Sequence, residues 1–277
     1  MSKPLPLSSH LIVTHQSLRA LMGWAAEFVE KTTRSGRRVI WAPAHALGGA
    51  VSLRTWVLDR AAAALGDSAP EDTSLLLSGA ADAIVIADPA SADAASLEWL
   101  TDMLSCSEEV ADLVPVPPLP QLVVLVPARG GAEGAASDFL AKLTALGSEE
   151  VRATGHGGFE LLNFAGDVNA ALGRNDKILA AMALSPVPLP QEDYNAVASA
   201  AGADARAVTT FVEGPLFQAA GGYITPAAAE VRAMLRESLE PADLFDAAAL
   251  LLPVVEARYP GLPDARVELT MRSGRPG

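Results

Sequence analysis

Short apolar runs, each followed by a helical pattern, constrain the fold of this chain more than any other feature. The runs are mostly apolar, and the first of them is charged only at its entry: residues 37–43, 83–87, 121–127 and 159–164. Strands as apolar as these are buried on both faces, which occurs when helices cover a parallel sheet. The sequence therefore predicts an α/β fold with a parallel sheet flanked by helices.

The character of the chain changes near Leu172-Gly173. From residue 176 onward the pattern is mostly helical, and residues 216–218 and 223–225 flank a glycine turn that is typical of a small hairpin. Helix, helix, hairpin and helix is the order of a winged helix. We therefore expect two domains, an α/β domain over residues 1–172 and a smaller winged-helix-like domain over residues 173–277, with residues 271–277 as a frayed tail.

Composition excludes several classes of function. The net charge of −13 opposes nucleic-acid binding, and residues 193–205 of the expected winged helix contain no lysine or arginine. The single cysteine, Cys106, rules out an internal disulfide, and His10, His15 and His156 lack metal-site spacing. No apolar run reaches the ~20 residues that a membrane helix needs. We expect a soluble, cytoplasmic protein that binds no nucleic acid, membrane or metal.

Residues 83–97, with the sequence AIVIADPASADAASL, resemble the second nucleotide motif of a P-loop ATPase. In that motif an apolar strand ends in Asp-Asp, and an Asp and a Ser-Leu pair follow at the start of a helix. Here the strand ends in Ala87-Asp88, and Asp93 and Ser96-Leu97 follow at matching spacing. Alanine offers no ligand atom where the first acid would hold the Mg²⁺ water shell. The motif therefore predicts the fold without its metal ligand.

A phosphate-binding loop needs glycines for close backbone approach, a lysine for the phosphate charge and a hydroxyl for Mg²⁺. The expected strand-to-helix junction at residues 41–53 reads WAPAHALGGAVSL. If Gly48 takes the second glycine of the motif, then Gly49 and Ala50 replace the lysine and the hydroxyl residue. Gly48 and Gly49 can still turn the backbone, and a helix N-terminus favours an anion, but most of the charge compensation is missing.

Residues 18 to about 252 resemble a degenerate member of the signal-transduction ATPases with numerous domains, an AAA-like branch of the P-loop proteins of bacterial type. The blocks that carry the resemblance occur in the family's order: RVIWAPAHALGGAVSLRTWV, IVIADPASADAASLEWL, LVVLVPAR, ILAAMALSPVPLPQEDYNAVA and GGYITPAAAEVRAML. The resemblance implies that Arg129 takes the polar sensor position and Asp88 the second acid of the Asp-Asp pair. It thus implies a remnant nucleotide site at Gly48, Gly49, Asp88 and Arg129.

Several of these residues have a second interpretation. Asp88 is a residual catalytic base or, as we expect, a cap of the loop after the strand, because a base needs a positioned metal-phosphate substrate. Asp93 is expected to start the following helix. Arg129 is either a phosphate sensor or a partner of an acid across the sheet edge. His45 is expected to be a solvated loop histidine rather than an anion ligand.

These departures from the ATPase motifs predict a pseudo-ATPase that is not an enzyme, with no catalytic residue and no cofactor. We expect a regulatory or scaffolding protein that contacts a protein partner or a second copy of itself. One alternative is a weak ATP- or ADP-binding protein or ATPase that uses the remnant site. A further alternative is an inactive subunit of an AAA-like multi-subunit machine.

Overall fold

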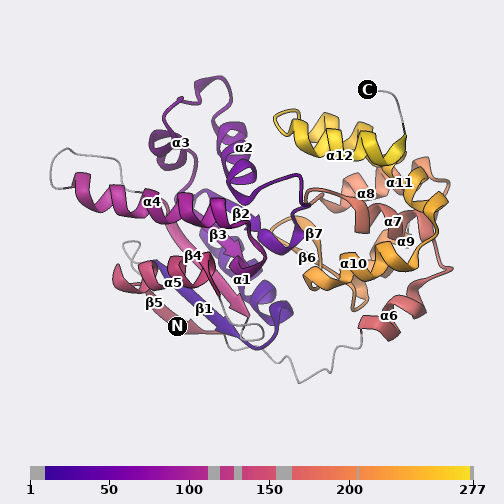
Figure 1. Cartoon of the computed structure of the whole chain (residues 1–277), viewed down its shortest axis with the longest axis horizontal. Helices are drawn as coiled ribbons and strands as arrows, with labels where there is room; N and C mark the ends of the chain where they lie inside the picture. Colours follow the sequence, from indigo (N-terminus) through magenta and orange to yellow (C-terminus); the bar gives the residue numbers. More distant parts are fainter. Residues whose placement is uncertain (1–9, 112–118, 128–132, 154–163, 205, 275–277) are drawn as a thin grey trace. The chain divides into compact units, whose positions relative to one another are not determined.

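The computed structural model describes residues 10–111, 119–127, 133–153, 164–204 and 206–274 (Figure 1). Contacts divide the chain into two units, the first formed by residues 1–44 and 52–156 and the second by residues 45–51 and 157–277. This division differs from the expected boundary at residues 172 and 173. Both α6 (Phe164–Ala171) and the short segment 45–51 belong to the second unit.

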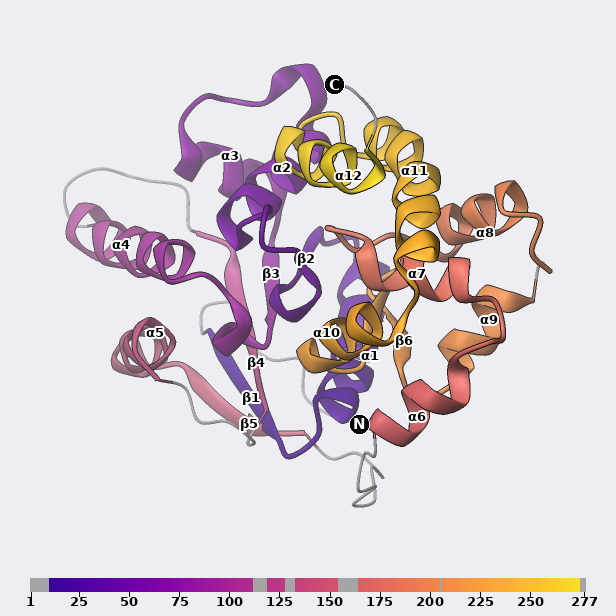
Figure 2. The same ribbon diagram turned by 45° about the vertical axis from the view of Figure 1, so that its right-hand side comes forward.

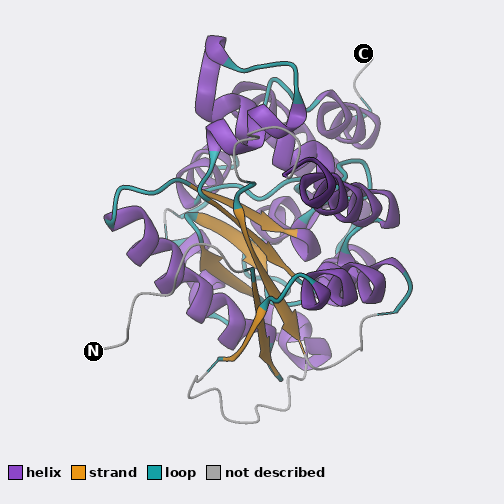
Figure 3. Cartoon of the chain, turned by 90° about the vertical axis from the view of Figure 1, so that its left-hand side faces the viewer, coloured by secondary structure: helices purple, strands orange, loops and turns teal. Residues whose placement is uncertain are grey.

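The first unit contains a five-stranded sheet in the order β2-β3-β4-β1-β5, and the neighbouring strands all run parallel (Figure 2). The strands are β1 (Leu11–His15), β2 (Val39–Pro43), β3 (Ala83–Ala87), β4 (Gln121–Pro127) and β5 (Glu149–Arg152). Three of them match expected strands, and the prediction of a parallel sheet flanked by helices is confirmed. In Figure 3 the strands form one twisted layer, as the handedness of extended L-residues requires.

Two strands, β1 and β5, were not expected from the sequence. The apolar run of β1 is short, since it consists of Leu11, Ile12 and Val13 before Thr14. β5 has the sequence EEVR and exposed acids, because it lies at the edge of the sheet. The expected strand at residues 159–164 is wrong at Phe164, which begins α6, and its remaining residues lie outside the described part of the chain.

Helices connect the strands of the first unit: α1 (Leu18–Arg34), α2 (Leu53–Leu65), α3 (Thr73–Ala80), α4 (Ala94–Ala111) and α5 (Ala135–Ala145), with short 3₁₀ turns at Ala44–Ala46, Gly66–Ser68 and Pro89–Ser91. α1 packs against β1, β2 and β4, whereas α2 packs against β2. The connection from β1 to β2 runs toward the β2 edge of the sheet. The connections from β2 to β3, from β3 to β4 and from β4 to β5 run in the opposite direction, toward the β5 edge. Right-handed crossovers therefore place α1 on one face and α2–α5 on the opposite face.

The second unit is helical apart from one hairpin. Its elements are α6, α7 (Asp176–Leu184), α8 (Gln191–Ala200), α9 (Ala207–Glu213), β6 (Phe217–Ala220), β7 (Tyr223–Pro226), α10 (Ala229–Ser238), α11 (Pro241–Arg258) and α12 (Pro263–Ser273). The residues from Ile178 to Leu184 of α7 are all buried, and α8, α9, α10 and α11 pack around this helix.

The hairpin and the final helix test two expectations. β6 and β7 pair antiparallel around Gly221-Gly222, whose φ values of 59° and 85° suit the left-handed turn of a two-residue hairpin. The expected hairpin is therefore confirmed. The expected frayed tail is wrong at residues 271–273, which continue α12 because Leu269 and Ser273 are buried and α12 packs on α11.

Candidate functional site

The carboxyl ends of β1 and β4 meet where the sheet changes direction. The connection that leaves β1 runs toward β2, whereas the connection that leaves β4 runs toward β5 on the other side of β1. Open α/β sheets bind their ligands outside the carboxyl ends of the strands at such a switch point. A nucleotide site is therefore expected at this edge of the sheet. The connection from β1 to α1 is its first element.

The connection from β1 to α1 is too short to form a phosphate loop. Only Gln16 and Ser17 separate the two elements. The Ser17 amide donates to His15 Nδ1 at 2.9 Å, and Leu21 N donates to the Ser17 carbonyl at 3.2 Å. A glycine-rich loop that surrounds phosphates and ends in Lys-Ser/Thr spans about eight residues. At the switch point the chain instead makes a tight turn without glycine or lysine.

The end of β3 lies near the switch point, since β3 pairs with β4. Ala87 is 0% exposed and lies between Pro43 of β2 and Leu125 of β4. Its methyl group fills the core at the position where the resemblance expects a metal-binding carboxylate. Within the described residues, no group of three histidine, cysteine, aspartate or glutamate side chains is arranged to hold a metal ion.

Asp88 follows in the left-handed region, at φ 56° and ψ 69°. Its amide donates to the Leu125 carbonyl at 3.0 Å, and its carboxylate accepts a 2.5 Å hydrogen bond from Ser91 Oγ. Burial raises the pKa of Asp88, although the hydrogen bond from Ser91 opposes this shift. The side chain thus closes the turn after β3, which agrees with the expected capping role.

Asp93 joins two helices at the same edge. Its Oδ1 accepts from Ser96 N at 2.8 Å, and its Oδ2 accepts from Ser96 Oγ at 2.7 Å and from Leu53 N at 3.0 Å. Ser96 Oγ in turn accepts from Arg54 N at 2.9 Å. Burial opposes ionisation, but the hydrogen bonds from Ser96 and Leu53 outweigh it and lower the pKa of Asp93. The expected helix-starting role is confirmed, and the link to the first turn of α2 is an addition that local spacing did not predict.

Gly48 and Gly49 belong to the second unit. The Gly48 amide donates to the Pro186 carbonyl at 2.7 Å, and a Cβ on Gly48 would lie 2.9 Å from Pro186 Cα. Close packing is therefore a sufficient reason for glycine at position 48. Gly49 is exposed, and a Cβ there would meet nothing within 4 Å.

The described residues of the expected nucleotide site do not all belong to one unit. Gly48 and Gly49 lie in the second unit, Asp88 lies in the first, and Arg129 lies outside the described residues. The loop aligned with the phosphate-binding motif follows the edge strand β2, not the switch-point strand β1. A shared site of these four residues stays a prediction. The expectation that His45 is solvated is wrong, because this side chain is only 3% exposed.

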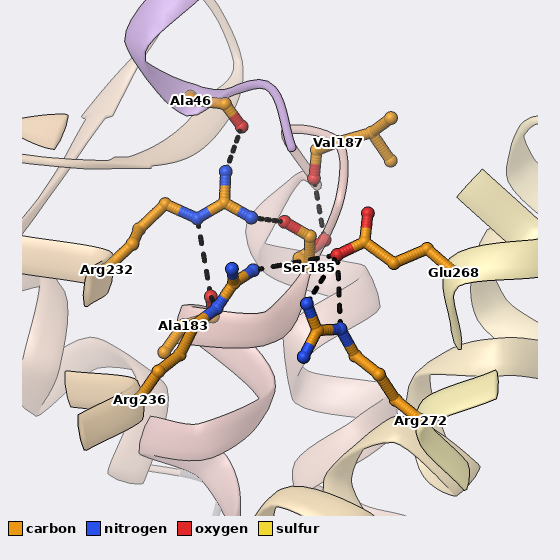
Figure 4. A network of polar contacts seen from close by, with 8 residues as sticks. All are labelled: Ala46, Ala183, Ser185, Val187, Arg232, Arg236, Glu268 and Arg272. Atoms are coloured by element: carbon orange, nitrogen blue, oxygen red, sulfur yellow. Dashed lines mark hydrogen bonds and ion pairs between the residues drawn. The ribbon is translucent and has the colours of Figure 1, made fainter. Parts of the chain in front are cut away.

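An arginine of α10 holds the segment 45–51 within the second unit (Figure 4). Arg232 is 7% exposed and donates to the carbonyl groups of Ala46 at 2.9 Å, Ala183 at 3.3 Å and Ser185. Burial, reinforced by the nearby charge of Arg236, lowers the pKa of Arg232 to about 10. The three carbonyl dipoles are therefore the groups that stabilise this buried charge.

Two more arginines and one glutamate continue this network (Figure 4). Arg236 Nε donates to the Ala183 carbonyl at 3.0 Å, and its Nη2 lies 4.0 Å from Glu268 Oε1. Arg272 reaches the same oxygen with Nε at 3.2 Å and Nη2 at 3.1 Å. Arg236 Nη2 and Glu268 Oε2 are buried without a hydrogen-bond partner in the described part of the molecule. This cluster could not be predicted from a sequence motif, because its members come from two helices, α10 and α12, that are far apart in the chain.

Comparison with known proteins gives a distant likeness to a solved structure. No family model matches the chain, and no curated protein matches it. The chain is similar to the solved structure of a signal-transduction ATPase with numerous domains that carries a tetratricopeptide repeat sensor, from Pyrococcus horikoshii, with a TM-score of 0.42 and 11% sequence identity. The match covers 96% of this chain and 52% of the other, so the chain spans about half the length of that protein.

Proposed function

We propose that this chain is a non-catalytic pseudo-ATPase that acts as a regulatory or scaffolding protein through contacts with a protein partner or with a second copy of itself. The observation that carries the proposal is the carboxyl edge of the sheet at its switch point. There a buried alanine, Ala87, replaces the metal-binding acid, and Gln16 and Ser17 alone connect β1 to α1.

Phosphoryl transfer depends on positioning and on electrostatic stabilisation of the phosphates by metal ions and cationic groups. The two acids described at this edge, Asp88 and Asp93, both accept hydrogen bonds from their own turn or helix. Their negative charges repel a triphosphate unless a metal ion bridges them. The edge is therefore better suited to maintaining the fold than to binding ATP.

A role in protein contact is supported by large apolar side chains that the second unit leaves exposed. Val267 and Met271 lie one turn apart on α12 and are 48% and 74% exposed, and Phe245 on α11 is 49% exposed. Exposed apolar side chains that lie next to one another, as Val267 and Met271 do on α12, are typical of sites of interaction. No helix of the described residues has both the length and the apolar character to cross a bilayer.

Calorimetric titration of the full chain with ATP and with ADP, each with and without Mg²⁺, tests this proposal. We expect no magnesium-dependent heat at high-micromolar nucleotide. Asp88→Asn is the informative variant, and Asp82→Asn is its matched control. Asp82 directly precedes β3, at the amino end of the strand, whereas Asp88 directly follows its carboxyl end. Magnesium-dependent binding that only Asp88→Asn abolishes would overturn the proposal.

One observation favours weak nucleotide binding as a second candidate function. Asp88 combines a left-handed backbone with a raised pKa at the carboxyl end of a central strand. Backbone strain and perturbed pKa values both concentrate at functional sites. The magnesium-dependent arm of the same titration decides between the two functions.

A further inference from the structure

The second unit contains an open cavity of about 500 Å³, lined by residues of that unit alone. Its wall is formed by the segment 45–51, by α10 and by α12, which contribute Gly49, Ala50, Arg236 and Arg272 among others. Cavities of roughly 300–1,000 Å³ with a few converging polar groups are typical of small-molecule sites. The size and the lining of this cavity are therefore compatible with a small ligand.

The lining of this cavity carries two arginines and two acids, Arg236, Arg272, Asp264 and Glu268. It leaves one arginine donor without a hydrogen bond among the described residues. Glu268 offers a single oxygen, Oε1, to both Arg236 and Arg272, and Arg236 Nη2 has no hydrogen-bond partner among the described residues. Arg232 adds a third guanidinium next to that of Arg236, since both donate to the Ala183 carbonyl (Figure 4). Burial lowers the pKa of Arg236, and the charge of Arg272 lowers it further. An added oxyanion would relieve this repulsion.

The segment 45–51 supplies backbone donors on another part of the wall. Within the described chain, the amides of Gly49 and Ala50 donate to no other group, and both residues are exposed. Gly49 has no side chain, and a Cβ there would meet no atom within 4 Å. A ligand in the cavity can therefore approach the Gly49 backbone. Consecutive amides in a turn form concave sites that bind anions.

The carboxylate of Asp264 limits which ligands suit the cavity. It lines the same cavity and makes no ion pair with any described cation. A free carboxylate disfavours a ligand that carries negative charge throughout, but it accepts hydrogen bonds from a hydroxyl or amino group. The cavity thus offers cationic donors on one part of its wall and an acceptor on another.

We propose that this cavity binds a small organic oxyanion, a phosphate monoester or a carboxylate, that also carries a hydroxyl or amino group. Arg236, Arg272 and the amides of Gly49 and Ala50 bind the oxyanion, and Asp264 accepts a hydrogen bond from the hydroxyl or amino group. This goes beyond the proposed scaffolding role, because it gives the second unit a small-molecule ligand of its own.

Calorimetry of the full chain at fixed ionic strength, with glycerol 3-phosphate, lactate and inorganic phosphate as probes, tests the inference. We expect saturable binding of glycerol 3-phosphate or lactate without Mg²⁺, and weaker binding of inorganic phosphate. Arg236→Gln and Arg272→Gln should each weaken binding at least roughly tenfold, as expected for loss of a charge-assisted hydrogen bond. Asp264→Ala removes the acceptor, so it should weaken binding of the hydroxylated probes and leave the affinity for inorganic phosphate unchanged or higher.

Arg266→Gln is the matched control, because Arg266 is exposed on the same helix but does not line this cavity. It removes the same charge and should change binding by less than about twofold, since exposed charges are screened. Equal weakening in Arg266→Gln, or no saturable binding of any probe, would overturn the inference.

Two features keep this result separate from the proposed function. Among the described residues, the Arg272 guanidinium bonds only the Glu268 carboxylate, so Arg272→Gln is expected to fold. This holds even if Arg236→Gln, which also loses a bond to the Ala183 carbonyl, does not fold. Thermal unfolding of each variant checks this. Binding at the cavity is independent of Mg²⁺ and insensitive to Asp88→Asn, whereas a nucleotide site at the sheet edge has the opposite properties.

Discussion

Gly48 and Gly49 are neighbours in the chain, but their surroundings place different demands on them. A methyl group at position 48 would come within 2.9 Å of Pro186 Cα and 3.1 Å of Glu268 Oε2, whereas one at position 49 would meet open space. Overpacking of a tight site costs about 1–3 kcal/mol. We therefore expect Gly48→Ala to lower the free energy of unfolding by this amount, and Gly49→Ala to change it by less than about 0.5 kcal/mol. Denaturant unfolding measures both, and equal losses would show that close packing does not explain Gly48.

Asp88 and Asp93 should contribute to stability with opposite dependence on pH. The folded chain raises the pKa of Asp88 above its ordinary value of 3.8 and lowers that of Asp93 below it. The contribution of Asp93 is therefore present above pH 3.8 and is lost as pH falls through its lowered pKa. The ionised form of Asp88 destabilises the fold as pH rises from 3.8 through its raised pKa.

Asp88→Asn should therefore be neutral or stabilising at pH 7. Asparagine keeps an acceptor for Ser91 Oγ and tolerates the left-handed backbone. The advantage over the unmodified chain should disappear below pH 3.8, where Asp88 is protonated in both states. Unfolding curves at several pH values measure this difference. A large loss of stability at pH 7 would contradict a destabilising role for the Asp88 charge.

At the scale of elements, Asp93 connects the starts of two helices, whereas most caps serve one. It bonds Ser96 at the start of α4 and Leu53 at the start of α2. Asp72 caps only α3, through Leu75 N at 3.0 Å. Loss of one cap costs about 1 kcal/mol, so Asp72→Ala should cost about that much and Asp93→Ala clearly more. Denaturant unfolding compares the two variants, and equal costs would contradict a dual role for Asp93.

The elements also show how far the sequence predicts this fold. Strands β2, β3 and β4 were predictable because buried central strands require continuous apolar runs. The strands β1 and β5 were missed, since one has a short apolar run and the other is an exposed edge. Without β1 the switch point could not be located, and the phosphate loop was assigned to the connection after β2. The arginine cluster was not predictable either, because α10 and α12 are brought together only by tertiary packing.

At the scale of the whole molecule, the segment 45–51 joins the second unit although the residues on both sides of it belong to the first. Arg232 and the Gly48 amide hold it there through the carbonyl groups of Ala46 and Pro186. Arg232→Met removes the side-chain donor to the buried carbonyl groups of Ala46 and Ser185 and one of the two arginine donors to that of Ala183, and should cost roughly 2–4 kcal/mol. We also expect faster hydrogen exchange at the Gly48 amide. Arg266→Met, on the exposed side of α12, is the control, and unchanged exchange at Gly48 in Arg232→Met would contradict this account.

We expect the whole chain to lack magnesium-dependent nucleotide binding at the carboxyl edge of its sheet. Its five-stranded sheet is parallel, and the described carboxyl edge of that sheet has a tight turn at Ser17 and a buried methyl group at Ala87. Titration of the unmodified chain with ATP, with and without Mg²⁺, tests this claim most directly. The account predicts that Mg²⁺ makes no difference to the heat at high-micromolar ATP. Saturable binding that appears only when Mg²⁺ is present would contradict it.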